Sequence, residues 1–194
     1  MEPLLIPDIV LIGPIGAGKS TLAKLLEQEL ALPRCCMDDE RWPYMEEAGY
    51  DKSVERQILA QEHNYRNVFR YWKQFEAYMV ERLLAEHRGH IIDFGACQFV
   101  YEDPADFARV QKTLAPYPNV VLILPSPDLD EFLRVVKGRS WDGVAGGFDF
   151  QEHFVKHPSN QALAKLIVYT ESKSPKETCR EILSKAAAVP KAFP

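Results

Sequence analysis

A glycine-rich segment near the start of the chain has the residue types and spacing needed to hold phosphate groups. It reads Gly13-Pro14-Ile15-Gly16-Ala17-Gly18-Lys19-Ser20, which fits the pattern G-x-x-x-x-G-K-[ST] in full. Glycines allow successive backbone N–H groups to close around phosphate oxygens, and a helix that begins there points its positive end at them. We expect Lys19 to neutralise the β- and γ-phosphates during catalysis, and Ser20 to ligate Mg²⁺. The motif, extended to Thr21, predicts a nucleoside triphosphate site with ATP and Mg²⁺ as cofactors.

A second group of chemically capable residues is Asp38-Asp39-Glu40-Arg41, which follows the apolar run 32–37. A carboxylate near a substrate hydroxyl can remove its proton, and an arginine can hold an anionic group of the acceptor. We therefore predict that Asp38, or else Asp39, is the general base and that Arg41 binds substrate. The alternative is that one of these acids only caps the following helix.

Asp93 ends the short apolar run that begins at His90. A carboxylate at the end of a buried strand beside a phosphate-binding loop can hold Mg²⁺ or its water shell, as in a Walker B element. We predict that Asp93 is a metal ligand. The alternative is that it caps the turn at Gly95.

The segment 138–149 has the composition of a mobile lid. It contains four glycines between Gly138 and Gly147, and Arg139, Ser140, Trp141 and Asp142 lie among them. A cation at the leading edge of such a loop can close over a nucleotide. A surface loop without a function is the alternative.

Five apolar runs predict the strands that must position these residues. They span 8–12, 32–37, 90–94, 120–124 and 164–169, and helix-like stretches separate them, beginning with 20–30. Strands that alternate with helices favour an α/β fold with a parallel sheet covered on both faces. Ligands of such sheets bind at the carboxyl ends of the strands, where the glycine-rich segment, Asp38 and Asp93 all fall.

An insert at about 44–88 separates the second and third strands, and its part 53–87 is predicted to be helical. Aromatic and apolar residues recur there at helical spacing, which favours a face packed on the core, with a substrate-pocket wall as the alternative. These residues are Tyr65, Phe69, Trp72, Phe75 and Met79. Three arginines, Arg56, Arg66 and Arg70, are expected on a solvated face, with an anionic substrate as the alternative.

Composition narrows the class of partner. A chain of 194 residues has room for one α/β domain, and a net charge of −5 with a pI near 5.6 favours a small-molecule partner over nucleic acid.

Four cysteines without metal-type spacing favour reduced thiols and a cytoplasmic location. No apolar run is long enough to span a membrane, and no signal-type segment begins the chain, so a soluble protein is expected. His153 and His157 are four residues apart without a third ligand, which disfavours a zinc site. The sequence defines no oligomeric state.

The glycine-rich loop, the acids after the second strand and the arginine-bearing lid together resemble the small P-loop kinases of the shikimate kinase and nucleotide kinase type. The resemblance implies a three-layer P-loop NTPase fold with a parallel five-stranded sheet, a helical substrate-binding insert and a short lid, all within one domain, 1–194. It also implies that Arg134 lies near the adenine, that Arg139 acts from the lid, and that 166–175 forms the last strand and the adenine-side loop. The D-D-x-R spacing resembles that of polynucleotide kinase-like and zeta-toxin-like phosphotransferases, in which the first acid is the base.

Two departures from the shikimate kinase pattern affect the expected identity of the phosphate acceptor. Shikimate kinases carry a glycine triplet after the third strand, whereas this chain has Phe94-Gly95-Ala96-Cys97-Gln98 at that place. We predict that Gly95 contributes to acceptor binding. The lid lacks the R-P-L-L continuation. We therefore expect an acceptor other than shikimate.

The leading functional hypothesis is an ATP-dependent phosphotransferase that moves the γ-phosphate to a hydroxyl or phosphate of a metabolite, nucleoside or antibiotic-like molecule. One alternative is a nucleotide-binding switch that acts on a protein partner, although N-K-x-D and D-x-x-G elements are missing from the sequence. Another is a nucleic-acid 5′-hydroxyl kinase, which the D-D-x-R element permits and the acidic balance disfavours.

Overall fold

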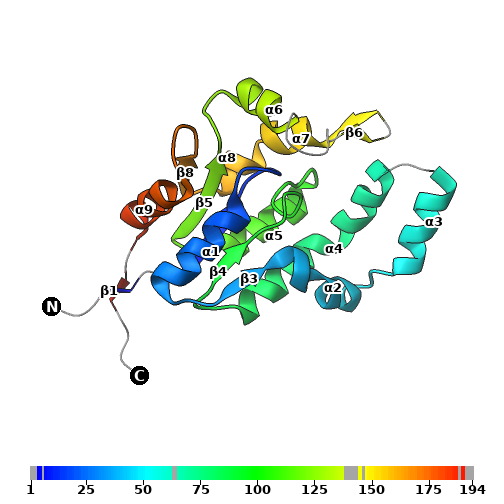
Figure 1. The fold of residues 1–194 in the computed structure, drawn as a ribbon. Helices are drawn as coiled ribbons and strands as arrows, with labels where there is room; N and C mark the ends of the chain where they lie inside the picture. Colours follow the sequence, from blue (N-terminus) through cyan, green and yellow to red (C-terminus); the bar gives the residue numbers. More distant parts are fainter. Residues whose placement is uncertain are drawn as a thin grey trace.

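A computed structural model describes residues 4–5, 7–62, 65–137, 144–145, 147–187 and 189–190. Its centre is a five-stranded, fully parallel sheet in the order β3-β4-β2-β5-β8 (Figure 1). The strands are β2 (Ile9–Ile12), β3 (Arg34–Cys36), β4 (Ile91–Asp93), β5 (Asn119–Leu124) and β8 (Leu166–Tyr169). All five predicted strands are confirmed, and the glycine-rich loop leaves the central one.

Helices cover both faces of the sheet, as the predicted three-layer α/β fold requires. Alternate residues of β2 enter two different cores, since Val10 and Ile12 pack on one side and Ile9 and Leu11 on the other. One face carries α1 (Lys19–Leu30) and α9 (Pro175–Lys185), and the other carries α4 (Tyr65–Glu86) and α5 (Pro104–Leu114) (Figure 1). Burial on both faces explains why the strands are continuously apolar.

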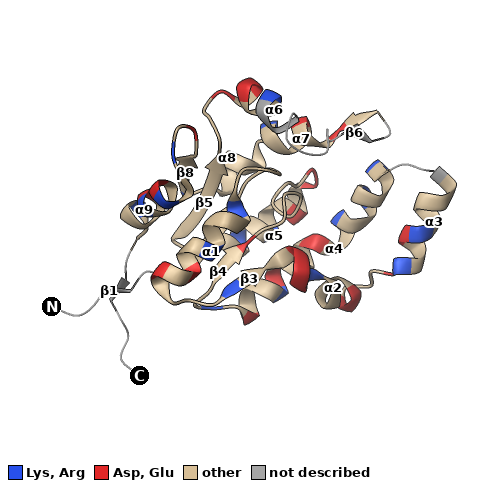
Figure 2. Ribbon diagram, viewed as in Figure 1, with Lys and Arg blue, Asp and Glu red and all other residues tan. Residues whose placement is uncertain are grey.

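The region between β3 and β4 is helical from its start. The helices are α2 (Met37–Glu47), α3 (Lys52–Glu62) and α4. The helix α2 begins directly after β3 with an acidic first turn (red in Figure 2) and includes residue 44, where the insert was expected to begin. The stretch 53–87, expected as one helical part, is divided between α3 and α4, which pack against each other. Figure 1 shows both extending beyond the sheet.

The remaining elements lie between β5 and the C-terminal end. They are α6 (Leu129–Lys137), the antiparallel pair β6 (Val144–Ala145) and β7 (Phe148–Asp149), α7 (Phe150–Lys156) and α8 (Ser159–Leu163), with β1 (Leu4–Leu5) pairing β9 (Val189–Pro190) near the chain ends. Of the predicted lid, residues 138–143 and 146 lie outside the described residues. Over the part of the chain that is described, no helix is both long and apolar enough to cross a membrane.

Candidate active site

The loop between β2 and α1 is held against the sheet by its first glycine. Gly13 has φ 146°, and a Cβ atom built on it would lie 2.4 Å from the carbonyl oxygen of Ile123 in β5. Any side chain at this position would therefore force the loop away from the sheet. The helix α1 begins at Lys19, and its N-cap residue, Gly18, has no side chain that could occupy the first-turn N–H groups. These amides are oriented to bind an anion.

Lys19 lies buried at the mouth of this loop. Its ammonium donates hydrogen bonds to the carbonyl oxygens of Gly13, at 2.7 Å, and Pro14, at 3.1 Å. Burial lowers the pKa of Lys19, and the carboxylates of Asp93 and Asp38 act in the opposite direction. A phosphate group entering the loop would supply the negative charge that this buried cation favours.

Asp93 ends β4 beside the loop with its carboxylate buried. Neither of its oxygens has a hydrogen-bond partner among the described residues, and the nearest cation in an ion pair is Arg34, whose Nη1 lies 4.0 Å from Oδ2. Burial raises the pKa of Asp93, while the nearby hydroxyl of Ser20, and then the charges of Lys19 and Arg34, oppose this shift. A buried carboxylate that has the Ser20 hydroxyl nearby but no well-formed hydrogen bond is costly, and a bound cation would reduce this cost.

The residues present fit Mg²⁺. A carboxylate oxygen and a serine hydroxyl are hard oxygen ligands, and Mg²⁺ commonly takes only one or two protein ligands, with phosphate oxygens and water completing its shell. Within the described ranges, no group of three or more His, Cys, Asp or Glu side chains could hold a metal alone. The donor set at Ser20 and Asp93 therefore suits a nucleotide-bound Mg²⁺ better than a protein-caged metal.

A cavity of about 530 Å³, here called the P-loop cavity, lies beside the loop. Its walls come from Gly16–Gly18 and Thr21, from the start of α6, and from the segment after β8. The residues from that last segment are Thr170, Glu171, Ser172 and Lys173. The resemblance to small P-loop kinases implies an adenine-side loop in this segment.

Arg134 does not line the P-loop cavity. It is exposed on α6, and its charge acts on Asp130. The α6 side chains on the cavity wall are Glu131 and Phe132 instead. The role of Arg134 near the base stays a prediction, and the α6 wall of this cavity consists of an apolar ring and a carboxylate.

Asp38 lies in the first turn of α2, facing the segment after β4. Its side chain is 55% exposed, and its Oδ1 lies 3.7 Å from Nη1 of Arg41. The N-cap residue of α2 is Cys36, so neither Asp38 nor Asp39 occupies the capping position. A Cβ atom on Gly95 would lie 2.3 Å from Oδ1 of Asp38, so the absence of a side chain there makes room for this carboxylate.

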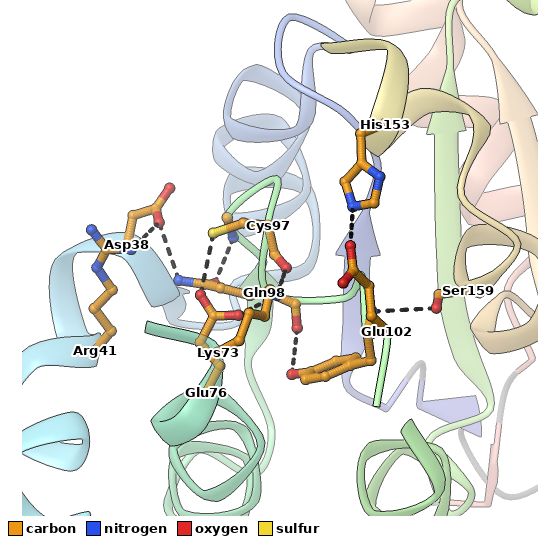
Figure 3. Close-up of polar contacts among 11 residues, drawn as sticks. Asp38, Arg41, Lys73, Glu76, Cys97, Gln98, Glu102, His153 and Ser159 are labelled. Carbon is orange, nitrogen blue, oxygen red and sulfur yellow. Dashed lines mark hydrogen bonds and ion pairs between the residues drawn. The ribbon is translucent and has the colours of Figure 1, made fainter. Parts of the chain in front are cut away.

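Gln98 forms a hydrogen bond to Asp38 and was missed as a site residue by sequence reasoning. Its buried side chain donates from Nε2 to Oδ1 of Asp38, at 3.1 Å, and accepts at Oε1 from the backbone N–H of Gly95, at 2.7 Å (Figure 3). The hydroxyl of Tyr101 donates to the carbonyl oxygen of Gln98, at 2.8 Å. A signal existed in the sequence, because Gln98 is a polar residue among apolar neighbours, with Cys97 before it and Phe99 after it.

A second cavity, of about 320 Å³, opens at Asp38 and is here called the aromatic cavity. It is lined by Ile15, Asp38, Arg41, Tyr65, Val68, Phe69, Trp72, Ala96, Cys97, Phe150 and Phe154. The aromatic stripe of α4 therefore packs on the core, and part of it also lines this cavity. Phe75, Met79 and Phe69 belong to the buried core, whereas Phe69 and the partly buried Trp72 also form cavity wall, and Tyr65 is 58% exposed.

The guanidinium of Arg41 lies over two indole rings at the edge of the aromatic cavity. Its Cζ is 4.2 Å from the ring centroid of Trp42 and 4.8 Å from that of Trp72. Its Nε is buried and has no hydrogen-bond partner among the described residues. Stacking on both rings restricts the orientation of the arginine.

Comparison with known proteins gives one family. A family model described as "AAA domain" matches residues 9–140, which is more than half of the chain. The chain belongs to the AAA domain family. Comparison with curated protein sequences gives no match.

Solved structures share the fold of this AAA-domain chain. Shikimate kinase from Acinetobacter baumannii in complex with shikimate has a TM-score of 0.57 at 18% identity, with 92% of each chain covered. Shikimate kinase from Bacteroides thetaiotaomicron has a TM-score of 0.55 at 18% identity, with 94% of this chain and 98% of that chain covered. The YorR protein from Bacillus subtilis, in complex with phosphorylated GDP, has a TM-score of 0.51 at 18% identity over 91% of this chain and 94% of that one. At these identities the likeness is one of fold.

A partly buried ion pair supports the segment that carries Gln98 in this AAA-domain chain. The ammonium of Lys73 donates to the carboxylate of Glu76 and to the carbonyl oxygen of Cys97 (Figure 3). The thiol of Cys97 donates to the other oxygen of Glu76, at 3.4 Å. Burial raises the pKa of Cys97, so the thiol keeps the proton that it donates. The ion pair thereby anchors the segment after β4 to α4.

The predicted site residues thus fall into three groups. The loop 13–21, Asp93, Asp38 and Gly95 meet at the carboxyl end of the sheet, and Arg41 joins them at the aromatic cavity. Arg134 is not among the residues that line either cavity. Arg139 lies outside the described residues.

Proposed function

We propose that this protein transfers the γ-phosphate of ATP to a hydroxyl of a small molecule. One observation carries the proposal: the phosphate-binding loop lines two cavities at once. Gly16 forms wall of the P-loop cavity, and the preceding Ile15 forms wall of the aromatic cavity, where Asp38 also lies. A donor and an acceptor bound on the two sides of one loop would meet at its phosphate end.

The proposed step uses Asp38 as the general base. The acceptor oxygen attacks the γ-phosphorus and forms a new P–O bond, while the bond from that phosphorus to the β–γ bridging oxygen breaks and its electron pair leaves with ADP. The hydroxyl proton passes to the Asp38 carboxylate. A phosphate acceptor would need no such base at neutral pH, so the presence of Asp38 favours a hydroxyl.

The remaining roles follow from charge. Lys19 stabilises the negative charge that develops on the transferred group, and we assign the same role to Arg139. Ser20 and Asp93 would hold Mg²⁺, which would neutralise phosphate charge there. The Asp38–Arg41 ion pair supports the likeness to D-D-x-R phosphotransferases, with Arg41 contacting the acceptor. Segments 44–88 and 138–149 act as acceptor-binding insert and lid of a single kinase domain.

The comparison structures support a small-molecule acceptor, because two of them are named shikimate kinases. Acidic and basic residues are interspersed along the helices (Figure 2), and this arrangement gives little support to a nucleic-acid partner. The four cysteines are free thiols, which supports a reducing compartment such as the cytoplasm.

The test is a screen for acceptors that gain the mass of one phosphate in the presence of Mg-ATP. The panel contains hydroxyl-bearing metabolites, nucleosides, antibiotics and a 5′-hydroxyl oligonucleotide. Lys19→Ala serves as the blank, and Lys24→Ala, an exposed lysine of the same helix, is the matched control. We expect transfer with the native protein and with Lys24→Ala but not with Lys19→Ala.

Two outcomes would contradict the proposal. Tight ATP binding without transfer to any compound would favour the nucleotide-switch alternative. Transfer confined to the oligonucleotide would favour a nucleic-acid kinase.

A further inference from the structure

The aromatic cavity is apolar although it opens at the proposed general base. Of its described lining residues, only Asp38 and Arg41 carry charge, and most of the others present carbon surface. Ligand pockets of this kind bind through apolar contact, with a few polar groups that fix orientation. The volume of about 320 Å³ is at the small end of ligand pockets and suits a compact ligand.

Two aromatic clusters contribute to the wall of this cavity. In one, Trp72 lines the cavity and packs edge to face against Trp42, with ring centroids 6.3 Å apart. In the other, Phe69 lies 5.6 Å from both Phe150 and Phe154. The clusters share α4, since α2 and α4 supply the first and α4 and α7 the second.

The polar atom of Trp72 is already satisfied within the protein. Its Nε1 donates a hydrogen bond to Oε2 of Glu55, at 2.9 Å. The rest of the indole is carbon surface, which can contact a ligand ring but offers it no hydrogen bond. Tyr65, an exposed aromatic residue that also lines the cavity, adds a further ring surface.

The charges of the cavity largely offset each other. Asp38 and Arg41 form an ion pair at 3.7 Å, and the guanidinium is stacked on two indoles. A polyol bound here would place several hydroxyls against carbon, and each hydroxyl without a partner costs free energy. A molecule with one hydroxyl near Asp38 and an apolar body avoids this cost.

We infer that the acceptor is a ring-containing, largely apolar alcohol or phenol without a net charge, and that the product is its phosphate monoester. This inference rests on the proposed function and adds the substrate class. The bond changes are those given for the transfer step, with the ring outside the reacting bonds.

The experiment compares transfer to 2-naphthylmethanol with transfer to shikimate and to D-gluconate under Mg-ATP. Products are identified by mass, and binding of each acceptor in the presence of Mg-ADP is measured by calorimetry. We expect kcat/KM for 2-naphthylmethanol to exceed that for either polyol by about tenfold or more. Preference for shikimate or gluconate would overturn the inference while leaving the kinase proposal intact.

Variants of the cavity wall test whether the preference for 2-naphthylmethanol depends on the aromatic cavity. Phe69→Ala and Trp72→Ala should raise KM for 2-naphthylmethanol by about tenfold, with KM for ATP unchanged, because each removes a ring from the wall. Phe69→Leu keeps an apolar side chain and serves if the alanine variant does not fold. Tyr78→Phe is the matched control, since this residue of α4 bonds to Glu47 at 2.6 Å and does not line the cavity. Unchanged KM in both Phe69 variants would overturn the inference.

Binding separates a failure of the inference from a failure of the proposed function. If 2-naphthylmethanol binds, and binding is lost in Phe69→Ala and weakened in Phe69→Leu, but no acceptor is phosphorylated, then the kinase proposal fails and the ligand class is supported. If none of the three compounds binds or is phosphorylated, the inference is overturned.

Discussion

The two cavities beside the glycine-rich loop are built in different ways. The P-loop cavity takes one wall from a short continuous segment, Gly16–Gly18, whose backbone provides the contacts. The aromatic cavity is assembled from side chains of α2, α4, α7 and the segment after β4, which are far apart in the sequence. A backbone site depends on local sequence, whereas a side-chain site depends on packing.

Their electrostatics differ as well. Lys19 and Asp93 are buried charged residues. Burial lowers the pKa of Lys19 and raises the pKa of Asp93, which in each case favours the neutral form. Asp38, at the aromatic cavity, remains 55% exposed beside Arg41. We therefore expect substitutions beside the glycine-rich loop to act by altering the charge near the phosphates. Substitutions beside the aromatic cavity should act by altering the position of the base and the acceptor.

The largest effect is expected from Lys19→Ala. Loss of the ammonium removes a positive charge from the phosphate end of the loop, and we expect kcat to fall by about 1000-fold with the fold retained. Steady-state kinetics together with thermal melting checks this, and Lys24→Ala should behave as the native protein. Retained turnover with unchanged ATP affinity would contradict the assignment of the loop.

Asp38→Asn should have the next largest effect. The amide has nearly the same shape but cannot accept the proton, so we expect kcat to fall by about 100-fold. The dissociation constant for ATP should stay unchanged, because Asp38 does not line the P-loop cavity. Measurement of both constants decides the role, since an equal loss of ATP binding would indicate a metal-binding or structural residue.

The loop side could be predicted from the sequence because it depends on local patterns. The strand β2 and the start of α1 near Lys19 follow from an apolar run and glycine spacing, and the role of the segment after β8 follows from the resemblance to small P-loop kinases. The acids Asp38 and Asp93 were found because each follows an apolar run. Proximity at the carboxyl ends of parallel strands then follows from topology.

The aromatic side could not be predicted in the same way. One stripe on α4 runs from Tyr65 to Met79, and its spacing is the same along its length. The helix extends beyond the sheet, so Phe75 and Met79 pack in the core, whereas Phe69 and Trp72 pack against it and also line the cavity. Only the tertiary packing of α4 against α7 and α2 determines where core ends and cavity begins. The role of Gln98 was hidden for the same reason, because its partner Asp38 lies 60 residues away.

A moderate effect is expected from Gly95→Ala. The added Cβ would meet the Asp38 carboxylate at 2.3 Å, and the flexible side chain can move aside, so the fold should survive while the base is displaced. We expect kcat to fall by about tenfold, because small displacements of catalytic groups cost rate.

A double-mutant cycle tests this reason. In an Asp38→Asn background, Gly95→Ala should have no further effect on kcat if it acts through the base alone. Additive losses would show that Gly95 contributes independently, as a direct acceptor contact would.

The smallest effect concerns stability on the loop side. Burial raises the pKa of Asp93 above its ordinary value of 3.8, so the folded protein binds more protons than the unfolded chain between the two pKa values. Stability therefore falls as pH rises through this window, and the loss is complete above the folded-state pKa.

In Mg²⁺-free and nucleotide-free protein, Asp93→Asn should remove this penalty and raise Tm at pH 7 by a few degrees, since about 1 kcal/mol shifts the Tm of a domain of this size by roughly 2–4 °C. The difference in Tm between variant and native protein should shrink as pH falls toward 4. A lower Tm for the variant at pH 7 would mean that attraction to Lys19 and Arg34 outweighs burial, and that the loop side, like the aromatic side, is stabilised by its own ion pairs.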